Sequence, residues 1–143
     1  MSWSTCARGA NKPGLGELLG QFDAFLLAGG NPCYLRSLMR ITGADELITE
    51  RVRDGAIYAG ASAAAVVAGP TLRHFDELDS PDEAEEVIWD GLGLTQIVVA
   101  PHVDNPDFGD GCRRAGDLCA VEGLTVQPLT AAQALVIDGT SSA

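Results

Sequence analysis

The chain has 143 residues, a length typical of one domain, and 46% of them are hydrophobic and 20% charged, the balance of an ordinary globular protein. Its formal net charge is −11, from 20 acidic and 9 basic residues. This argues against nucleic acid or an anionic membrane as the partner, because both would repel the chain. The four cysteines show no CxxC spacing, residues 1–14 lack an apolar signal-peptide core, and no apolar run is long enough to span a bilayer. We therefore expect a cytoplasmic protein with free thiols.

The expected elements follow from periodicity and break signals, taken in chain order. Residues 1–14 are rich in Ser, Gly and Ala without periodicity, so we predict an irregular segment there and one α/β domain over residues 15–143. Helices are predicted at residues 15–22, 32–42, 45–53, between Ser62 and Gly69, and at 111–122. Strands are predicted at residues 24–28, 56–59, 96–100, 125–127 and 134–137, the last two forming a hairpin at the sheet edge.

The second predicted helix has clear end signals. Asn31 and Pro32 fit its N-cap and its first position, and Gly43 fits its end. Its spacing predicts that Leu35, Leu38 and Met39 face the core. The later stretch 73–90 is acidic, contains a proline and has no periodicity, which predicts a solvated surface loop.

The alternation of short strands with helices predicts a mostly parallel sheet with helices on both faces. In such sheets, chemistry collects just past the carboxyl ends of the strands. Three predicted strand ends carry glycine-rich or polar sequence: Gly29-Gly30-Asn31, Gly60-Ala61-Ser62 and Pro101-His102-Val103-Asp104. This coincidence favours an enzyme.

The stretch AIYAGASAAAVVAGPT, residues 56–71, allows two interpretations. A strand, a tight turn with one serine and a helix of small residues form the layout of a nucleophile elbow, in which Ser62 would attack and the start of the helix would offer N–H groups to an oxyanion. The other interpretation is an alanine-rich helix that Ser62 merely caps, because serine is among the preferred N-cap residues.

Three segments together resemble the dipeptidase E family of serine peptidases, also called alpha-aspartyl dipeptidases. They are AGGNPCYL at residues 28–35, GASAAAVVAGPTLR at residues 60–73 and WDGLGLTQIVVAPHVDNP at residues 89–106. Their order and spacing agree with the family, and the similarity covers about residues 18–139. The resemblance implies a flavodoxin-like three-layer α/β sandwich of the class I glutamine amidotransferase type.

The resemblance also implies a role for individual residues. Ser62 would be the nucleophile, His102 the general base, and the N–H groups of Gly30 and Ala63 the oxyanion hole. Glu77 falls at the family's acidic position by its spacing from the serine, with Asp76 and Asp79 left open as alternatives. The substrates implied are short peptides, including dipeptides with an N-terminal aspartate, with these residues assigned to substrate binding: Asn31, Arg113 and Arg114. No cofactor and no metal are expected, and homo-oligomerisation is left open.

Two departures from the family pattern bear on activity. Ala64 stands where the elbow normally has its second glycine, and the first βα units of the family's sheet have no counterpart before residue 15. The chain is therefore expected to be truncated at its N-terminus, and the alternative function is a catalytically impaired amidotransferase-like domain or a fragment without peptidase activity. A glutaminase would need a cysteine in place of Ser62, and a metal site at His102, Asp104 and His74 lacks a metal signature.

Overall fold

The computed structural model describes residues 14–138, so the predicted irregular segment lies outside the described residues except for Gly14. The helices in this range are α1 (Leu15–Leu19), α2 (Pro32–Thr42), α3 (Ala44–Arg53), α4 (Ala63–Ala68) and α5 (Gly109–Val121). The strands are β1 (Ala24–Leu27), β2 (Ile57–Gly60), β3 (Ile97–Ala100) and β4 (Thr125–Pro128). Two short 3-10 turns, η1 (Phe75–Glu77) and η2 (Pro81–Glu83), interrupt the acidic stretch. None of the helices described is long and apolar enough to cross a bilayer.

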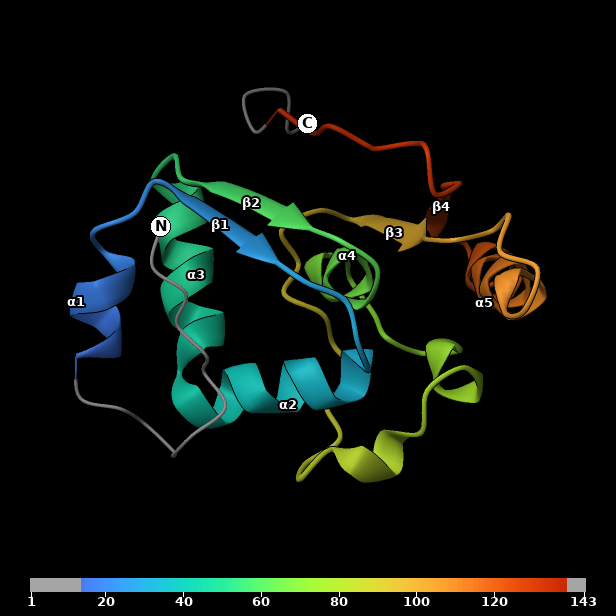
Figure 1. The fold of residues 1–143 in the computed structure, drawn as a ribbon, viewed down its shortest axis with the longest axis horizontal. Helices are drawn as coiled ribbons and strands as arrows, with labels where there is room; N and C mark the ends of the chain where they lie inside the picture. Colours follow the sequence, from blue (N-terminus) through green and yellow to red (C-terminus); the bar gives the residue numbers. More distant parts are fainter. Residues whose placement is uncertain (1–13, 139–143) are drawn as a thin grey trace.

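All the strand pairing within ladders is parallel. β1 pairs with β2, and β3 pairs with β4, as two separate two-stranded sheets. Parallel neighbours need a crossover connection, which α2 and α3 supply for the first pair and α5 for the second. The arrows of β1, β2 and β3 point the same way in Figure 1, so their carboxyl ends face one side of the molecule. The predicted α/β class with parallel strands is confirmed.

The core lies on one face of the β1–β2 pair. Phe25 and Tyr58 are register partners and point to this face, where Phe25 is buried. Helices α2, α3 and α4 pack against it, and their apolar side chains join Phe25 in one cluster (Figure 1). Helix α4 contacts both β2 and β3, and it therefore links the two strand pairs.

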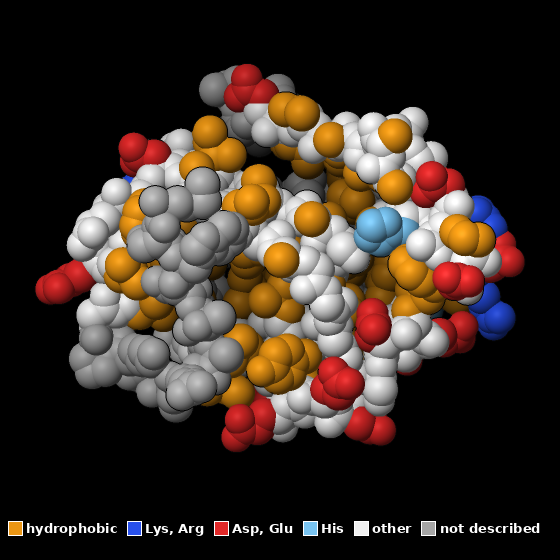
Figure 2. Space-filling model, in the orientation of Figure 1, with side chains coloured by type: hydrophobic (Ala, Val, Ile, Leu, Met, Phe, Trp, Pro, Cys, Tyr) orange, Lys and Arg blue, Asp and Glu red, His pale blue; other side chains and the backbone are white. Residues whose placement is uncertain are grey.

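The opposite face of β1 and β2 is open to solvent in the part of the chain that the structure describes. Side chains alternate along a strand, so Leu26 and Ile57 point away from the core and are 72% and 63% exposed. Figure 2 shows hydrophobic side chains gathered over these strands. No described helix covers Leu26 and Ile57, where the sequence pattern predicts a second helical layer.

Helix α2 begins and ends where its sequence predicts, but it buries a different face. Asn31 accepts hydrogen bonds from the N–H groups of residues 33 and 34, and Gly43 ends the helix at φ 79°. Met39 is buried as expected, whereas Leu35 and Leu38 are half-buried. Arg36 is buried instead, because it reaches two polar partners, the carboxylate of Asp45 and the carbonyl of Asp90.

Three sequence predictions at element level are wrong. The helix predicted for residues 15–22 stops at Leu19, since Gly20 follows it. No strand forms at residues 134–137, where Val136 is 87% exposed. The predicted edge hairpin is also absent, because β4 runs parallel to β3. A β-branched run forms a strand only when another strand offers it a ladder.

Candidate active site

The turn that carries Ser62 is tight and strained. β2 ends at Gly60, α4 begins at Ala63, and Ser62 between them has φ 57° and ψ −117°. A Cβ on Gly60 would lie 2.6 Å from the carbonyl oxygen of Ala64, so the close return of the chain requires a glycine there. A non-glycine residue with positive φ is uncommon, and such strain collects at functional sites. The geometry is the strand–turn–helix context that a nucleophile elbow requires.

The alternative in which Ser62 caps α4 is wrong. Its side chain makes no hydrogen bond to the first N–H groups of the helix. Its φ is positive, whereas N-cap residues usually adopt the β region. The hydroxyl is therefore available for another role.

The glycine-rich turn after β1 lies directly against Ser62. Register places Leu27 beside Gly60, so the two turns leave the sheet as neighbours. A Cβ on Gly29 would lie 2.8 Å from the Cβ of Ser62 and 3.2 Å from its Oγ. Gly30 has φ 136°, a conformation open to glycine and rare for other residues.

The two N–H groups expected to form an oxyanion hole are unoccupied by protein acceptors. Within residues 14–138, neither Gly30 N–H nor Ala63 N–H donates a hydrogen bond. Ala63 is the first residue of α4, where N–H groups have no partner inside the helix. Gly30 belongs to the turn that lies against Ser62, and Ala63 directly follows Ser62. Their N–H groups could therefore donate hydrogen bonds to an oxygen atom of a bound substrate.

Ala64 is accommodated at the elbow. It is completely buried, and its carbonyl accepts a 2.6 Å hydrogen bond from the hydroxyl of Tyr58 on β2. This bond fixes the first turn of α4 to the strand that precedes it. Burial raises the pKa of Tyr58, so the hydroxyl stays protonated and keeps donating.

His102 follows β3 in a second strained conformation. Its φ is 55°, and in the described part of the chain positive φ occurs at only three non-glycine residues: Ser62, His74 and His102. The imidazole is half-buried and meets the ring of Phe108 edge to face, with centroids 5.6 Å apart and an interplanar angle of 88°. Two of the three strained positions are thus the predicted catalytic pair.

Ser62 and His102 both follow the carboxyl ends of strands and are both partly accessible. No hydrogen bond joins them within the described residues. Helix α4 connects their strands, and the backbone after it comes close to β3, since a Cβ on Gly69 would lie 2.9 Å from the Ile97 carbonyl oxygen. Catalytic hydrogen bonds are often loose without substrate, so this geometry leaves the pairing as a prediction.

The three candidate acids lie on and just after η1, which packs against α5. Glu77 is exposed and has Arg114 as its ion-pair partner, with 3.7 Å between Oε2 and Nε. Partial desolvation and then the charge of Glu83 raise the pKa of Asp79. Within residues 14–138, none of Asp76, Glu77 and Asp79 hydrogen-bonds to His102, so the choice among them stays a prediction.

The residues predicted to bind substrate have other partners in this structure. Asn31 caps α2 and also donates to the carbonyl of Ser80 and to Glu83, which ties α2 to the acidic loop. Arg113 donates to the carbonyl of Val103, next to His102, and to Asp110. Arg114 keeps an exposed guanidinium beside Glu77. Of these, Arg114 is the most accessible to a substrate carboxylate.

Other reactive side chains are satisfied within the fold. His74 Nε2 lies 2.7 Å from Glu122 Oε1. The described cysteines are buried, and desolvation raises the pKa of all three, Cys33, Cys112 and Cys119, which keeps them as unreactive thiols. Residues 14–138 contain no group of three metal-ligating side chains that could hold an ion.

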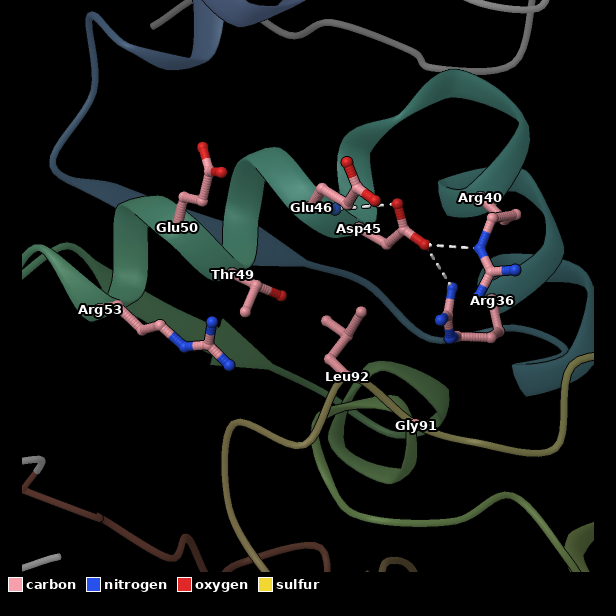
Figure 3. A pocket seen from close by; sticks show the side chains of 9 residues that line it. All are labelled: Arg36, Arg40, Asp45, Glu46, Thr49, Glu50, Arg53, Gly91 and Leu92. Carbon is pink, nitrogen blue, oxygen red and sulfur yellow. Dashed lines mark hydrogen bonds and ion pairs between the residues drawn. The ribbon is translucent and has the colours of Figure 1, made fainter.

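A separate cavity of about 410 Å³ lies between α2, α3 and residues 91–92 (Figure 3). Figure 3 shows the carboxylate of Asp45 held between Arg36 and Arg40, with Arg53 reaching in from the other end of α3. Three arginines and three acidic residues line the cavity, so their charges cancel. Neither Ser62 nor His102 lines this cavity. The ion pairs of Asp45 with Arg36 and Arg40 join α2 to α3 at its edge.

Sequence reasoning missed two residues that support the site. The strand pattern at residues 56–59 gives Tyr58 no role, although a buried tyrosine hydroxyl usually has a hydrogen-bond partner. Phe108 belongs to no sequence motif. Its ring contact with His102 depends on how the turn between the two residues folds. A signal for that turn was present in Asn105-Pro106-Asp107.

The chain is similar in sequence to known peptidases. The model of peptidase family S51 matches residues 9–143. An uncharacterized peptidase of Listeria innocua is 37% identical over 87 residues, covering 60% of this chain and 42% of that protein. Peptidase E of Streptomyces coelicolor is 35% identical over 91 residues, covering 64% of this chain and 36% of that protein. The chain therefore spans about half or less of these relatives.

A solved structure agrees with the fold. A crystal structure named for Peptidase E, from Listeria monocytogenes EGD-e, superposes with a TM-score of 0.70 at 28% sequence identity. The match covers 80% of this chain and 55% of that one.

Proposed function

The chain belongs to peptidase family S51, and from that premise we propose that it is a serine-type peptidase that hydrolyses short peptides through Ser62 and His102. The observation that carries the proposal is the conformation of Ser62. It sits in a strained turn with no capping bond, and the Gly29-Gly30 turn lies against its side chain. Strained backbone of this kind collects at functional sites, which supports a catalytic role for Ser62.

The chemistry follows from the groups gathered there. Ser62 Oγ attacks the peptide carbonyl carbon while an imidazole nitrogen of His102 takes the hydroxyl proton. The C–N bond then breaks, and His102 gives that proton to the leaving amine. Water attacks the acyl-serine, His102 takes a proton from the water, and the proton returns to Ser62 as the carboxylic acid leaves.

The negative charge on the carbonyl oxygen needs preorganised donors. We assign this role to the N–H groups of Gly30 and Ala63, which have no acceptor among the described residues. We keep Glu77 as the third triad member, with Asp76 and Asp79 as alternatives. In this structure the Glu77 carboxylate is paired with Arg114.

Peptides with an N-terminal aspartate are the substrates we propose. In a chain with a net charge of −11, an acidic substrate needs a local cation. Arg114 offers one with an exposed guanidinium, whereas Arg113 is engaged by Val103 and Asp110. Asn31 would contribute only by exchanging its contacts with Ser80 and Glu83.

A catalytically impaired domain is the second candidate. One observation favours it: Ser62 and His102 share no hydrogen bond within residues 14–138. In that case the fold would be retained without turnover.

Labelling and hydrolysis separate the two candidates. The purified protein is treated with a fluorophosphonate probe and assayed on Asp-Leu and Ala-Leu dipeptides. We expect labelling at Ser62 by peptide mapping, hydrolysis of Asp-Leu, and loss of both in Ser62→Ala. Ser80→Ala removes an exposed serine on the acidic loop and serves as the matched control. Folded protein that neither labels nor hydrolyses either peptide would favour the impaired domain.

A further inference from the structure

We propose that Phe108 is a positioning residue for His102, holding the imidazole in its working orientation by ring contact. This inference rests on the proposed function, because it assigns His102 the role of general base. It concerns a side chain that carries no motif and that the family resemblance did not single out.

The contact between the two rings has the geometry that aromatic pairs prefer. The centroids are 5.6 Å apart and the planes are nearly perpendicular at 88°. Rotation of the imidazole about its side-chain torsion would break this edge-to-face arrangement.

The backbone holds Phe108 in place relative to His102. Asn105 donates its N–H to the carbonyl of His102, and its side-chain oxygen accepts the N–H of Phe108 at 3.1 Å. At Gly109 the chain passes so close to the histidine segment that a Cβ would lie 2.8 Å from the Val103 carbonyl oxygen. Phe108 then starts α5 by accepting the N–H of Cys112.

Another side chain on α5 braces the same segment. Arg113 donates to the carbonyl of Val103, the residue after His102. The phenyl ring therefore projects from a short turn that is fixed at both ends. The edge-to-face contact with Phe108 would therefore resist rotation of the imidazole.

The test compares Phe108→Leu and Phe108→Tyr with a matched control, Phe22→Leu. Phe22 and Phe108 are similarly exposed, at 39% and 43%, so each leucine variant removes a half-exposed ring. We expect Phe108→Leu to lower kcat for Asp-Leu about tenfold with KM unchanged within about twofold, and Phe108→Tyr to restore kcat. Phe22→Leu is expected to keep wild-type kcat. Equal kcat in Phe108→Leu and wild type would overturn the proposal.

Proton NMR tests the contact without relying on turnover. The chain has two histidines, so His74→Gln assigns their ring protons. We expect the His102 ring protons to show a ring-current shift that disappears in Phe108→Leu and remains in Phe108→Tyr and Phe22→Leu. Unchanged His102 resonances in a folded Phe108→Leu protein would overturn the positioning role. The ring-current result in an inactive protein would support the contact while the proposed peptidase function fails.

Discussion

Gly29 and Ser62 are in backbone-to-side-chain contact although they belong to turns more than thirty residues apart. The Cα of Gly29 is so close that an added Cβ would lie 2.8 Å from the Cβ of Ser62, shorter than real Cβ contacts. The contact brings the Gly29-Gly30 turn and Ser62, the proposed nucleophile, to the same rim of the sheet.

Gly29→Ala is therefore expected to displace the Ser62 side chain. We expect fluorophosphonate labelling to slow at least about tenfold, with about 1–3 kcal/mol lost from the free energy of unfolding through overpacking. Gly16→Ala is the control, because its new Cβ would make only an ordinary 3.4 Å contact with Leu47. Labelling rate and urea denaturation measure the two effects, and wild-type labelling of Gly29→Ala would contradict the contact.

Asp45 holds α2 to α3 through Arg36, and both side chains are more than 90% buried. Asp45→Ala leaves the Arg36 guanidinium buried without its carboxylate, so we expect about 3–5 kcal/mol lower stability. Glu46→Ala changes an exposed neighbour on the same helix and is expected to cost less than about 1 kcal/mol. Urea denaturation compares the two, and equal midpoints would show that the pair contributes nothing.

The Asp45 carboxylate also leads us to expect that the protein loses stability at acidic pH. Burial alone would raise the pKa of Asp45, but hydrogen bonds from Arg40, Arg36 and the Glu46 N–H outweigh it and lower the pKa. A lowered pKa in the folded state stabilises the protein above the ordinary value of about 3.9. That stability is lost as the pH falls from about 4 through the folded-state pKa. Unfolding midpoints measured from pH 6 to pH 2 should drop less steeply in Asp45→Asn than in wild type.

The buried hydroxyl of Tyr58 leads us to expect a loss of stability at alkaline pH. Its folded-state pKa is raised by burial, so the stability it confers is complete below about pH 10, the ordinary tyrosine value, and is lost as the pH rises further. Tyr58→Phe removes the hydrogen bond to Ala64, costs about 1 kcal/mol at neutral pH and removes this alkaline loss. Tyr34→Phe, at an exposed tyrosine, is the control. Denaturation at pH 8 and pH 11 checks both statements.

Arg114 predicts a substrate-specific effect. If the exposed guanidinium of Arg114 binds the side-chain carboxylate of an N-terminal aspartate, we expect Arg114→Gln to raise KM for Asp-Leu about tenfold. The KM for Ala-Leu should change by less than about twofold. The loss of an ion pair with Glu77 alone would change both substrates alike. Steady-state kinetics on the two dipeptides distinguishes these outcomes.

The sequence predicted the Ser62 turn correctly because the constraint is local. A strand that ends in glycine, followed by a serine and small residues, has few ways to enter a helix, and the Gly60 contact with Ala64 shows why. The Asn31 cap was predictable for the same reason. Local chemistry at each of these two positions determines the backbone.

The proposed third triad member could not be chosen from sequence, since the candidates Asp76, Glu77 and Asp79 lie within four residues of one another. The path of that loop depends on distant contacts such as Asn31 with the Ser80 carbonyl, which no local pattern encodes. The strand expected at residues 134–137 failed for a related reason. Its β-branched residues have strand propensity, but a ladder needs a neighbour, and none pairs with them in the described chain.

The division of the strands into two ladders has a consequence for deuterium uptake. Opening events follow units that share hydrogen bonds and packing, so the amides of β1 and β2 are expected to exchange together, and those of β3 and β4 as a second group. Ser62 moves with the first group and His102 with the second. Helix α4 contacts β2 and β3, so we expect a ligand that spans Ser62 and His102 to slow uptake in the two groups at once.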